Sequence, residues 1–144
     1  MSKMTNDEIR DFLLRGTYTG KLGTINKDGM PHVVPIWYTV DKQDNVIFNT
    51  GSESVKAKNI RRDNRVRLCV DDQTPLFSFV IIDGIAQIER NESSEIYKWA
   101  KIIAARYMGD DKSEVYGRRN SGEGEVLVKI KPTRTVGQKD TAEW

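Results

Sequence analysis

Three short apolar runs, joined by turn sequences at hairpin spacing, are the strongest constraint on the fold of this chain. They cover Tyr18 to Asn26, Met30 to about Asp41, and Val46 to Thr50. A tight turn at Asn26-Lys-Asp-Gly29 joins the first two, and the polar segment 41–45 joins the second to the third. Runs this close together are typical of neighbouring antiparallel strands. The sequence therefore predicts an antiparallel meander at the start of the fold.

The rest of the chain adds helices and further strands to this meander. Thr5 and Glu8 form a capping box that opens a first helix, and the spacing of apolar residues predicts another helix from Ser93. A third, basic helix is expected from about Ser54 to Arg62. Further strands are expected at Arg65 to Asp71, at Leu76 to Glu89 with a bulge at Gly84, and at Glu125 to Ile130. Residues 109–123 read as a mobile polar loop. Six strands with inserted helices and no linker predict one mainly β domain, a small β-barrel over residues 1–144.

Composition excludes several kinds of chemistry. The 144 residues carry a net charge of only +2, less than a dedicated nucleic-acid binder usually has. With one cysteine, Cys69, and one histidine, His32, the chain has neither the ligands of a structural zinc site nor an internal disulfide. It has no Gly-x-Ser-x-Gly elbow, apolar signal segment or membrane-spanning run. We expect a cytoplasmic protein whose reactive group, if it is an enzyme, comes from an organic cofactor.

The basic helix carries charge in an unfavourable place. Six Lys or Arg and one acid, Asp63, lie between Ser54 and Arg67. Lys56 and Lys58 fall in the first turn, where the helix dipole disfavours cations. A solvated basic face is the simplest explanation. The alternative is an anion site, because the hydroxyl and backbone N–H groups at the helix start, with both lysines and the amide of Asn59, could hold a phosphate.

The run from Met30 to Val40 is apolar on both faces, so we expect a core on one side and a partner or ligand on the other. Pro31 and Pro35 cannot donate to a ladder, which predicts an edge strand or a local irregularity, with free backbone groups nearby. A buried barrel strand with edge prolines explains the same pattern, and His32 is expected to be packed and not catalytic. The aromatic residues of Phe77-Ser-Phe79 could form a wall against the ring of a ligand. Core packing explains them equally well.

Three segments together resemble a known family. They are Pro31-His-Val-Val-Pro-Ile-Trp37, Phe48-Asn-Thr-Gly-Ser-Glu-Ser-Val-Lys-Ala-Lys-Asn-Ile60 and Arg65-Val-Arg-Leu-Cys-Val-Asp-Asp72. Their order resembles that in the pyridoxamine 5'-phosphate oxidase-like split β-barrel superfamily, and most closely its short branch that uses FMN or a deazaflavin coenzyme. The resemblance covers roughly residues 5–136. True pyridoxamine phosphate oxidases have an Arg-rich pattern where this chain has Pro31 to Trp37, so vitamin B6 oxidation is not implied.

The resemblance implies a six-stranded antiparallel split β-barrel that forms a homodimer with cofactors at the subunit interface. It implies no metal and identifies no catalytic side chain. Val33, Val34, Pro35 and Ile36 would face the cofactor ring, while Thr50, Ser54, Lys56, Lys58 and Asn59 would hold its phosphate and ribityl chain. Phe77, Ser78 and Phe79 would come from the other subunit.

The function implied is an oxidoreductase that moves a hydride between a bound deazaflavin (coenzyme F-420) or FMN and a small organic substrate. The deazaflavin is narrowly favoured, because Arg61, Arg62, Arg65 and Arg67 offer more cations than the single phosphate of FMN can use. One alternative is a flavin-binding or electron-carrier module without a dedicated substrate. Another is a nucleic-acid-binding barrel that uses the basic segment, which salt-dependent binding to oligonucleotides would reveal.

Overall fold

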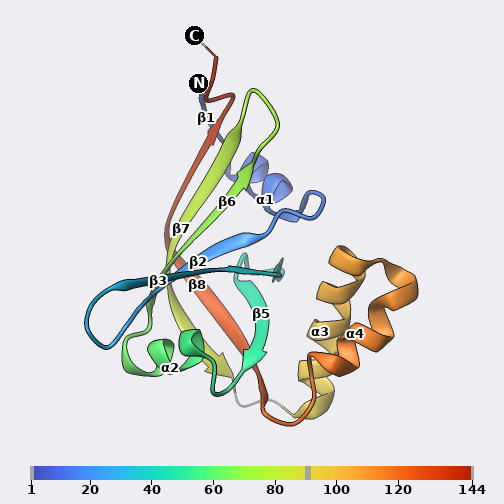
Figure 1. Cartoon of the computed structure of the whole chain (residues 1–144). Coiled ribbons are helices and arrows are strands. Elements are labelled where there is room, and N and C mark those ends of the chain that lie inside the picture. The colour runs from blue at the N-terminus through green and yellow to red at the C-terminus, as the bar shows by residue number, and fades with distance from the viewer. Residues whose placement is uncertain (1, 90–91, 144) are drawn as a thin grey trace.

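The computed structural model describes residues 2–89 and 92–143 and shows a curled antiparallel sheet with helices inserted between its strands (Figure 1). The elements, in chain order, are β1 (Ser2–Lys3), α1 (Asn6–Leu14), β2 (Gly20–Ile25), β3 (Pro31–Ile36), β4 (Thr39–Val40), β5 (Val46–Gly51), α2 (Val55–Arg62), β6 (Arg65–Asp72), β7 (Ser78–Glu89), α3 (Ser93–Met108), a 3₁₀ turn (Asp110–Lys112), α4 (Ser113–Arg119) and β8 (Glu125–Lys139). The mainly β, split-barrel prediction is confirmed, with more strands than the six expected.

The strand order in the sheet is β3-β2-β6-β7-β8-β5-β4, and β1 pairs with β8. Side chains on the inner face of these strands form the core, among them Leu22, Leu68 and Val128, each fully buried. The predicted meander is only partly present, because β2 pairs with β3 and β4 with β5, but β3 and β4 lie at opposite ends of the sheet order. The barrel is thus split between them.

The predicted strand from Met30 to Asp41 is interrupted. β3 ends at Ile36 and β4 begins at Thr39. This apolar run therefore forms two strands, one at each end of the strand order. Its even-numbered residues from His32 to Val40 face the core, where the Tyr38 hydroxyl donates a 2.6 Å hydrogen bond to the Leu13 carbonyl. The odd positions of β3 are exposed, Val33 at 64%.

The bulge predicted at Gly84 is confirmed by a shift of the β7–β8 register between Asp83 and Gly84. A Cβ added at Gly84 would lie 2.6 Å from the Ile130 side chain and 2.8 Å from the Lys131 carbonyl oxygen. Glycine is therefore required here by the close approach of β8. The predicted capping box of α1 and the Ser54 N-cap of α2 are also present.

Two predictions about the C-terminal third are wrong. Residues 109–123 do not form a loop, because α4 lies within them and packs against α3 (Figure 1). The last strand does not end at Ile130 but continues to Lys139 through pairing with β7. None of the helices in the described part of the chain is long and apolar enough to span a bilayer.

Candidate functional site

The free edge of β3 presents backbone groups for a ligand. At the β2–β3 turn the Asn26 N–H donates to the Met30 carbonyl at 2.9 Å, which makes these two residues a hydrogen-bonded pair. Such pairs alternate along an antiparallel ladder, so the 25/31, 23/33 and 21/35 pairs are non-hydrogen-bonded. The backbone N–H and C=O of Val33 therefore point away from β2. The predicted edge position of both prolines is confirmed, and it leaves the Val33 amide available.

A pocket of about 420 Å³ lies in the split, where β3, β5 and the start of α2 face the α3–α4 hairpin. Its walls are formed by Pro35, Ile36, Trp37, Asn49, Thr50, Gly51, Lys56, Ala100, Ile103, Tyr116, Arg119, Asn120 and Glu125. The structure thus brings together four of the residues predicted to bind cofactor: two from the ring-facing segment and two, Thr50 and Lys56, from the phosphate-binding segment.

Lys56 is the basic residue of α2 that faces this pocket. Its side chain is partly buried, and burial lowers the pKa of its ammonium group, an effect partly offset by the nearby carboxylate of Glu125. Next to it, the Thr50 hydroxyl donates to the Ser54 hydroxyl at 3.0 Å, and Ser54 in turn accepts from the Ala57 N–H at 3.2 Å. A partly desolvated ammonium group beside a capped helix start fits the phosphate of a nucleotide-like cofactor.

Sequence reasoning missed the opposite wall of this pocket. Glu125 begins β8 opposite Gly51, while Tyr116 and Arg119 come from α4, the helix that was expected to be a loop. Trp37 stacks on Tyr107 with ring centroids 5.2 Å apart and meets the edge of Tyr116 at 6.4 Å. The sequence carried no clear signal for this wall, because α4 has a glycine at position 117 and the place of Glu125 follows from the β5–β8 register.

Lys58 and Asn59 do not line the pocket. Lys58 is exposed and pairs loosely with Glu53 at 3.6 Å. Asn59 is 2% exposed, and its amide nitrogen donates to the Thr24 hydroxyl at 3.0 Å and to the Asn26 side-chain oxygen at 2.9 Å. This amide ties α2 to β2, and its expected role in cofactor binding stays a prediction.

Of the four arginines that follow, Arg65 and Arg67 pair with acids, whereas Arg61 and Arg62 donate to neutral oxygens. Arg61 donates to the Ser52 carbonyl and Arg62 to the Ile25 carbonyl. Two further ion pairs each use two hydrogen bonds: Arg65 binds Asp63 at 3.0 and 2.7 Å, and Arg67 binds Asp83 at 2.5 and 3.1 Å. The guanidinium of Arg65 lowers the pKa of Asp63 to about 2. The charge count is therefore reduced to Arg61 and Arg62, and the preference for a deazaflavin tail stays a prediction.

Phe77, Ser78 and Phe79 lie at the tip of the β6–β7 hairpin, at the opposite end of the molecule from α2 (Figure 1). Phe77 is 43% exposed with φ of 67°, and its carbonyl accepts from the Thr141 N–H at 2.9 Å. Within one chain this tip cannot reach the pocket in the split. Its predicted contact with cofactor requires a second chain.

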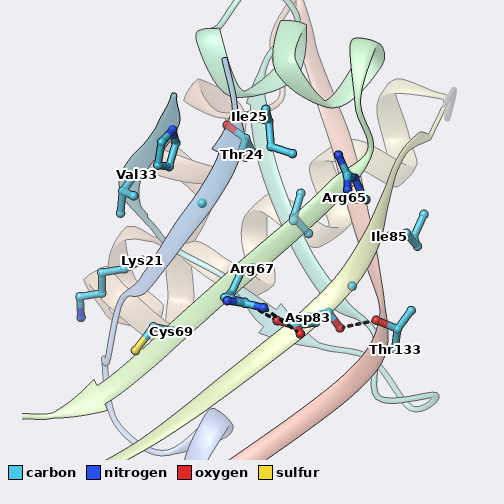
Figure 2. A pocket seen from close by; sticks show the side chains of 14 residues that line it. Lys21, Thr24, Ile25, Val33, Arg65, Arg67, Cys69, Asp83, Ile85 and Thr133 are labelled. Atoms are coloured by element: carbon cyan, nitrogen blue, oxygen red, sulfur yellow. Dashed lines mark hydrogen bonds and ion pairs between the residues drawn. The ribbon is translucent and has the colours of Figure 1, made fainter. Parts of the chain in front are cut away.

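A second and larger cavity, of about 690 Å³, lies on the outer face of β2, β3, β6 and β7. Figure 2 shows the Arg67–Asp83 ion pair on its floor, with the Thr133 hydroxyl donating to the Asp83 carbonyl at 3.1 Å and Val33 farther away on β3. Burial raises the pKa of the Cys69 thiol on the same face. β3 borders both cavities, because Val33 lines the outer cavity and Pro35 lines the pocket in the split.

Comparison with known proteins places these features in context. Over 81 residues the chain is 33% identical to a 5a,11a-dehydrotetracycline/5a,11a-dehydrooxytetracycline reductase of Streptomyces rimosus, a match that covers 51% of this chain and only 57% of that enzyme. A conserved hypothetical protein of Mycobacterium tuberculosis has a similar structure, with a TM-score of 0.82 and 30% identity, over 96% of this chain and 87% of that one. An F420 reductase has the same fold at 22% identity, with a TM-score of 0.70 over 87% of this chain and 94% of that one.

The family relationship covers nearly the whole described barrel. The model of the pyridoxamine 5'-phosphate oxidase family matches residues 5–138, from the cap of α1 to the end of β8. This range contains the edge strand β3, the capped helix α2 and the pocket between them. The chain belongs to the pyridoxamine 5'-phosphate oxidase family.

Proposed function

We propose that this protein is an oxidoreductase that transfers a hydride between a bound flavin-type cofactor, coenzyme F-420 or FMN, and a small organic substrate. Family membership and the similarity to a reductase of Streptomyces rimosus support the reaction class. The structural observation that carries the proposal is the position of Lys56, a partly buried cation in a pocket that adjoins the free edge of β3.

The residues of the split fit the two ends of such a cofactor. Lys56 and the Thr50–Ser54 hydroxyl pair would hold its phosphate at the start of α2. The free backbone groups of Val33 would meet the polar edge of the ring, and the apolar side chains of β3 would shield its face. When bound, the cofactor supplies the hydride chemistry, and the protein supplies binding and orientation.

The proposed site is completed by a second copy of the chain. Val33 and Ile85 are exposed apolar residues on the outer face shown in Figure 2, and Phe77 is an exposed apolar residue at the tip of the β6–β7 hairpin. A second chain packed on this face would cover them, and it would bring its own hairpin tip toward the split of the first. This arrangement accounts for the distance between the tip and α2 within one chain.

The proposal is tested by loading the purified protein with each cofactor. FMN and coenzyme F-420 are titrated separately, with binding followed by the change in cofactor fluorescence. The loaded, reduced protein is then mixed with quinones and conjugated enones under anaerobic conditions. We expect saturable binding of at least one cofactor and its oxidation by an organic acceptor with turnover. Absence of binding for both cofactors would refute the proposed function.

The same experiment separates the enzyme from an electron carrier. A carrier without a dedicated substrate would bind cofactor but pass electrons only to general acceptors such as ferricyanide. An enzyme shows saturation with one class of organic substrate. The pocket favours the enzyme, because its wall of Trp37, Tyr116 and Arg119 lies beyond the residues that the cofactor phosphate would use.

A further inference from the structure

Glu125 places a carboxylate in the same pocket as the proposed phosphate anchor. It is the first residue of β8, and its register partner is Gly51 at the end of β5, next to Thr50. Lys56 reaches the pocket from α2, so the two charges approach it from adjacent elements. They form no ion pair within 4 Å, and among the described residues no side chain donates a hydrogen bond to this carboxylate. The carboxylate is therefore available to a ligand that enters the pocket.

A carboxylate is an unusual neighbour for an anion site. It reduces the positive potential around Lys56, and this reduction costs a doubly charged ligand about twice as much as a singly charged one, because Coulomb energy is proportional to ligand charge. A phosphate monoester such as that of FMN carries close to two negative charges at pH 8, since its second pKa is near 6. A phosphodiester carries only one.

We propose that Glu125 is a specificity-determining residue that selects the pocket's ligand by charge, favouring a phosphodiester over a phosphate monoester dianion. This inference rests on the proposed function, because it assigns a role within the same cofactor site. It also replaces the count of arginines as the reason to prefer the deazaflavin coenzyme. That coenzyme joins its ring system to its tail through a phosphodiester.

Protonation of Glu125 should relax this selection. Burial raises the pKa of its carboxyl group, and Lys56 lowers it by a smaller amount. The other ionisable side chains in the pocket wall, Tyr116 and Arg119, both belong to α4; β3, β5 and α3 contribute none. The carboxylate loses its charge as the pH falls through its raised pKa. The charge of a phosphodiester does not change over this interval.

The test compares Glu125→Gln with the intact protein for three probes: FMN, coenzyme F-420 and riboflavin, which has no phosphate. At pH 8 we expect E125Q to bind FMN about tenfold more tightly, coenzyme F-420 about threefold more tightly, and riboflavin with unchanged affinity. Coenzyme F-420 binding to the intact protein should strengthen as the pH falls from 8 through the raised pKa of Glu125, and E125Q should lack this dependence on Glu125. The control is Glu123→Gln, which removes an equal charge from an exposed residue two positions away.

The outcomes separate this inference from the proposed function. If FMN and coenzyme F-420 bind but E125Q leaves their affinity ratio unchanged, or if E123Q changes that ratio equally, charge selection by Glu125 is wrong and the cofactor site stands. If neither cofactor binds to the intact protein or to E125Q, the cofactor site itself is wrong and the inference falls with it. Thermal unfolding of both variants confirms that they are folded, and the pH dependence of the intact protein tests the inference without any substitution.

Discussion

Lys56 and Lys58 lie two positions apart on α2 but have different surroundings. Lys56 lines the pocket in the split, whereas Lys58 is exposed and faces Glu53. Loss of a charge-assisted contact costs about 1.5–3 kcal/mol. We therefore predict that Lys56→Ala weakens cofactor binding roughly ten- to hundredfold. Lys58→Ala should change it by less than about threefold, because an exposed pair at this distance contributes little. Fluorescence titration of both variants measures the difference.

Riboflavin distinguishes a phosphate contact from a general disturbance of the pocket. Its affinity should be the same for Lys56→Ala as for the intact protein, because it lacks the group that Lys56 binds. Equal losses for FMN and riboflavin, or equal effects of the two lysine substitutions, would contradict the assignment of Lys56 as the phosphate anchor.

For single residues, the sequence predicted which residue types form the site better than it predicted where each side chain makes its contacts. The anion site at α2 was predicted from Ser52, Ser54, Lys56, Lys58 and Asn59. Of these, Ser54 caps the helix and Lys56 lines the pocket. Asn59 has the same local signal, but its amide is used by Thr24 on β2, a residue 35 positions away. No local pattern reveals such a long-range bond. Glu125 was missed for the same reason, because its place in the pocket follows from the β5–β8 register.

Among the elements, the α3–α4 hairpin shows how tertiary contact overrides propensity. Gly117 lowers the intrinsic helix propensity of its segment, so residues 109–123 read as a loop. In the structure Gly117 is buried, and a Cβ there would lie 3.0 Å from the Lys101 Cα. The glycine thus permits close packing of α4 on α3, and that packing stabilises the short helix. The helices with clear caps or stripes, α1, α2 and α3, were predicted.

Arg106 fixes the position of this hairpin relative to the barrel. From α3 its guanidinium donates to the carbonyls of Leu13, Gly16 and Tyr38 at 2.7, 2.9 and 2.9 Å. It also lies 4.7 Å from the centroid of the Tyr38 ring. Two of these carbonyls are at or just beyond the C-terminus of α1, where helix carbonyls have no partner within the helix. One side chain therefore links α1, α3 and the start of β4.

We predict that Arg106→Ala lowers the free energy of unfolding by about 2–3 kcal/mol, because several carbonyls lose a charged donor at once. Arg106→Lys should recover only part of this loss, since an ammonium group cannot reproduce the planar fork. The control is Arg118→Ala on α4, which breaks an exposed pair with Glu114 and a contact with the Tyr97 ring 5.0 Å away, and should cost about 1 kcal/mol. Urea unfolding measures all three. Equal stability of R106A and R118A would show that the guanidinium does not hold the hairpin.

For the whole molecule, the hairpins and turns in the sequence were enough to predict a barrel but not where it opens. The turn at residues 26–29 predicted the β2–β3 hairpin, and Gly84 predicted the bulge in β7. The interruption after Ile36 and the extension of β8 to Lys139 depend on pairing with distant strands. Since the pocket lies at the opening, its position could be inferred only from the resemblance to the family. The free edge of β3 was predictable because proline cannot pair on both sides.

The outer face of the sheet carries the remaining prediction, which concerns the dimer. Ile85 is 39% exposed at the cavity of Figure 2, so Ile85→Asp should leave the barrel folded while placing an unpaired charge in the proposed interface. The intact chain of 16.5 kDa is expected to have about twice that mass in light scattering at micromolar concentration, and I85D to shift toward the monomer. Cofactor affinity should fall with it, because the site needs the partner's hairpin tip. Val115→Asp, at a 69% exposed position on α4, is the matched control and should remain dimeric with unchanged affinity. A monomeric intact protein that still binds cofactor would exclude the shared site.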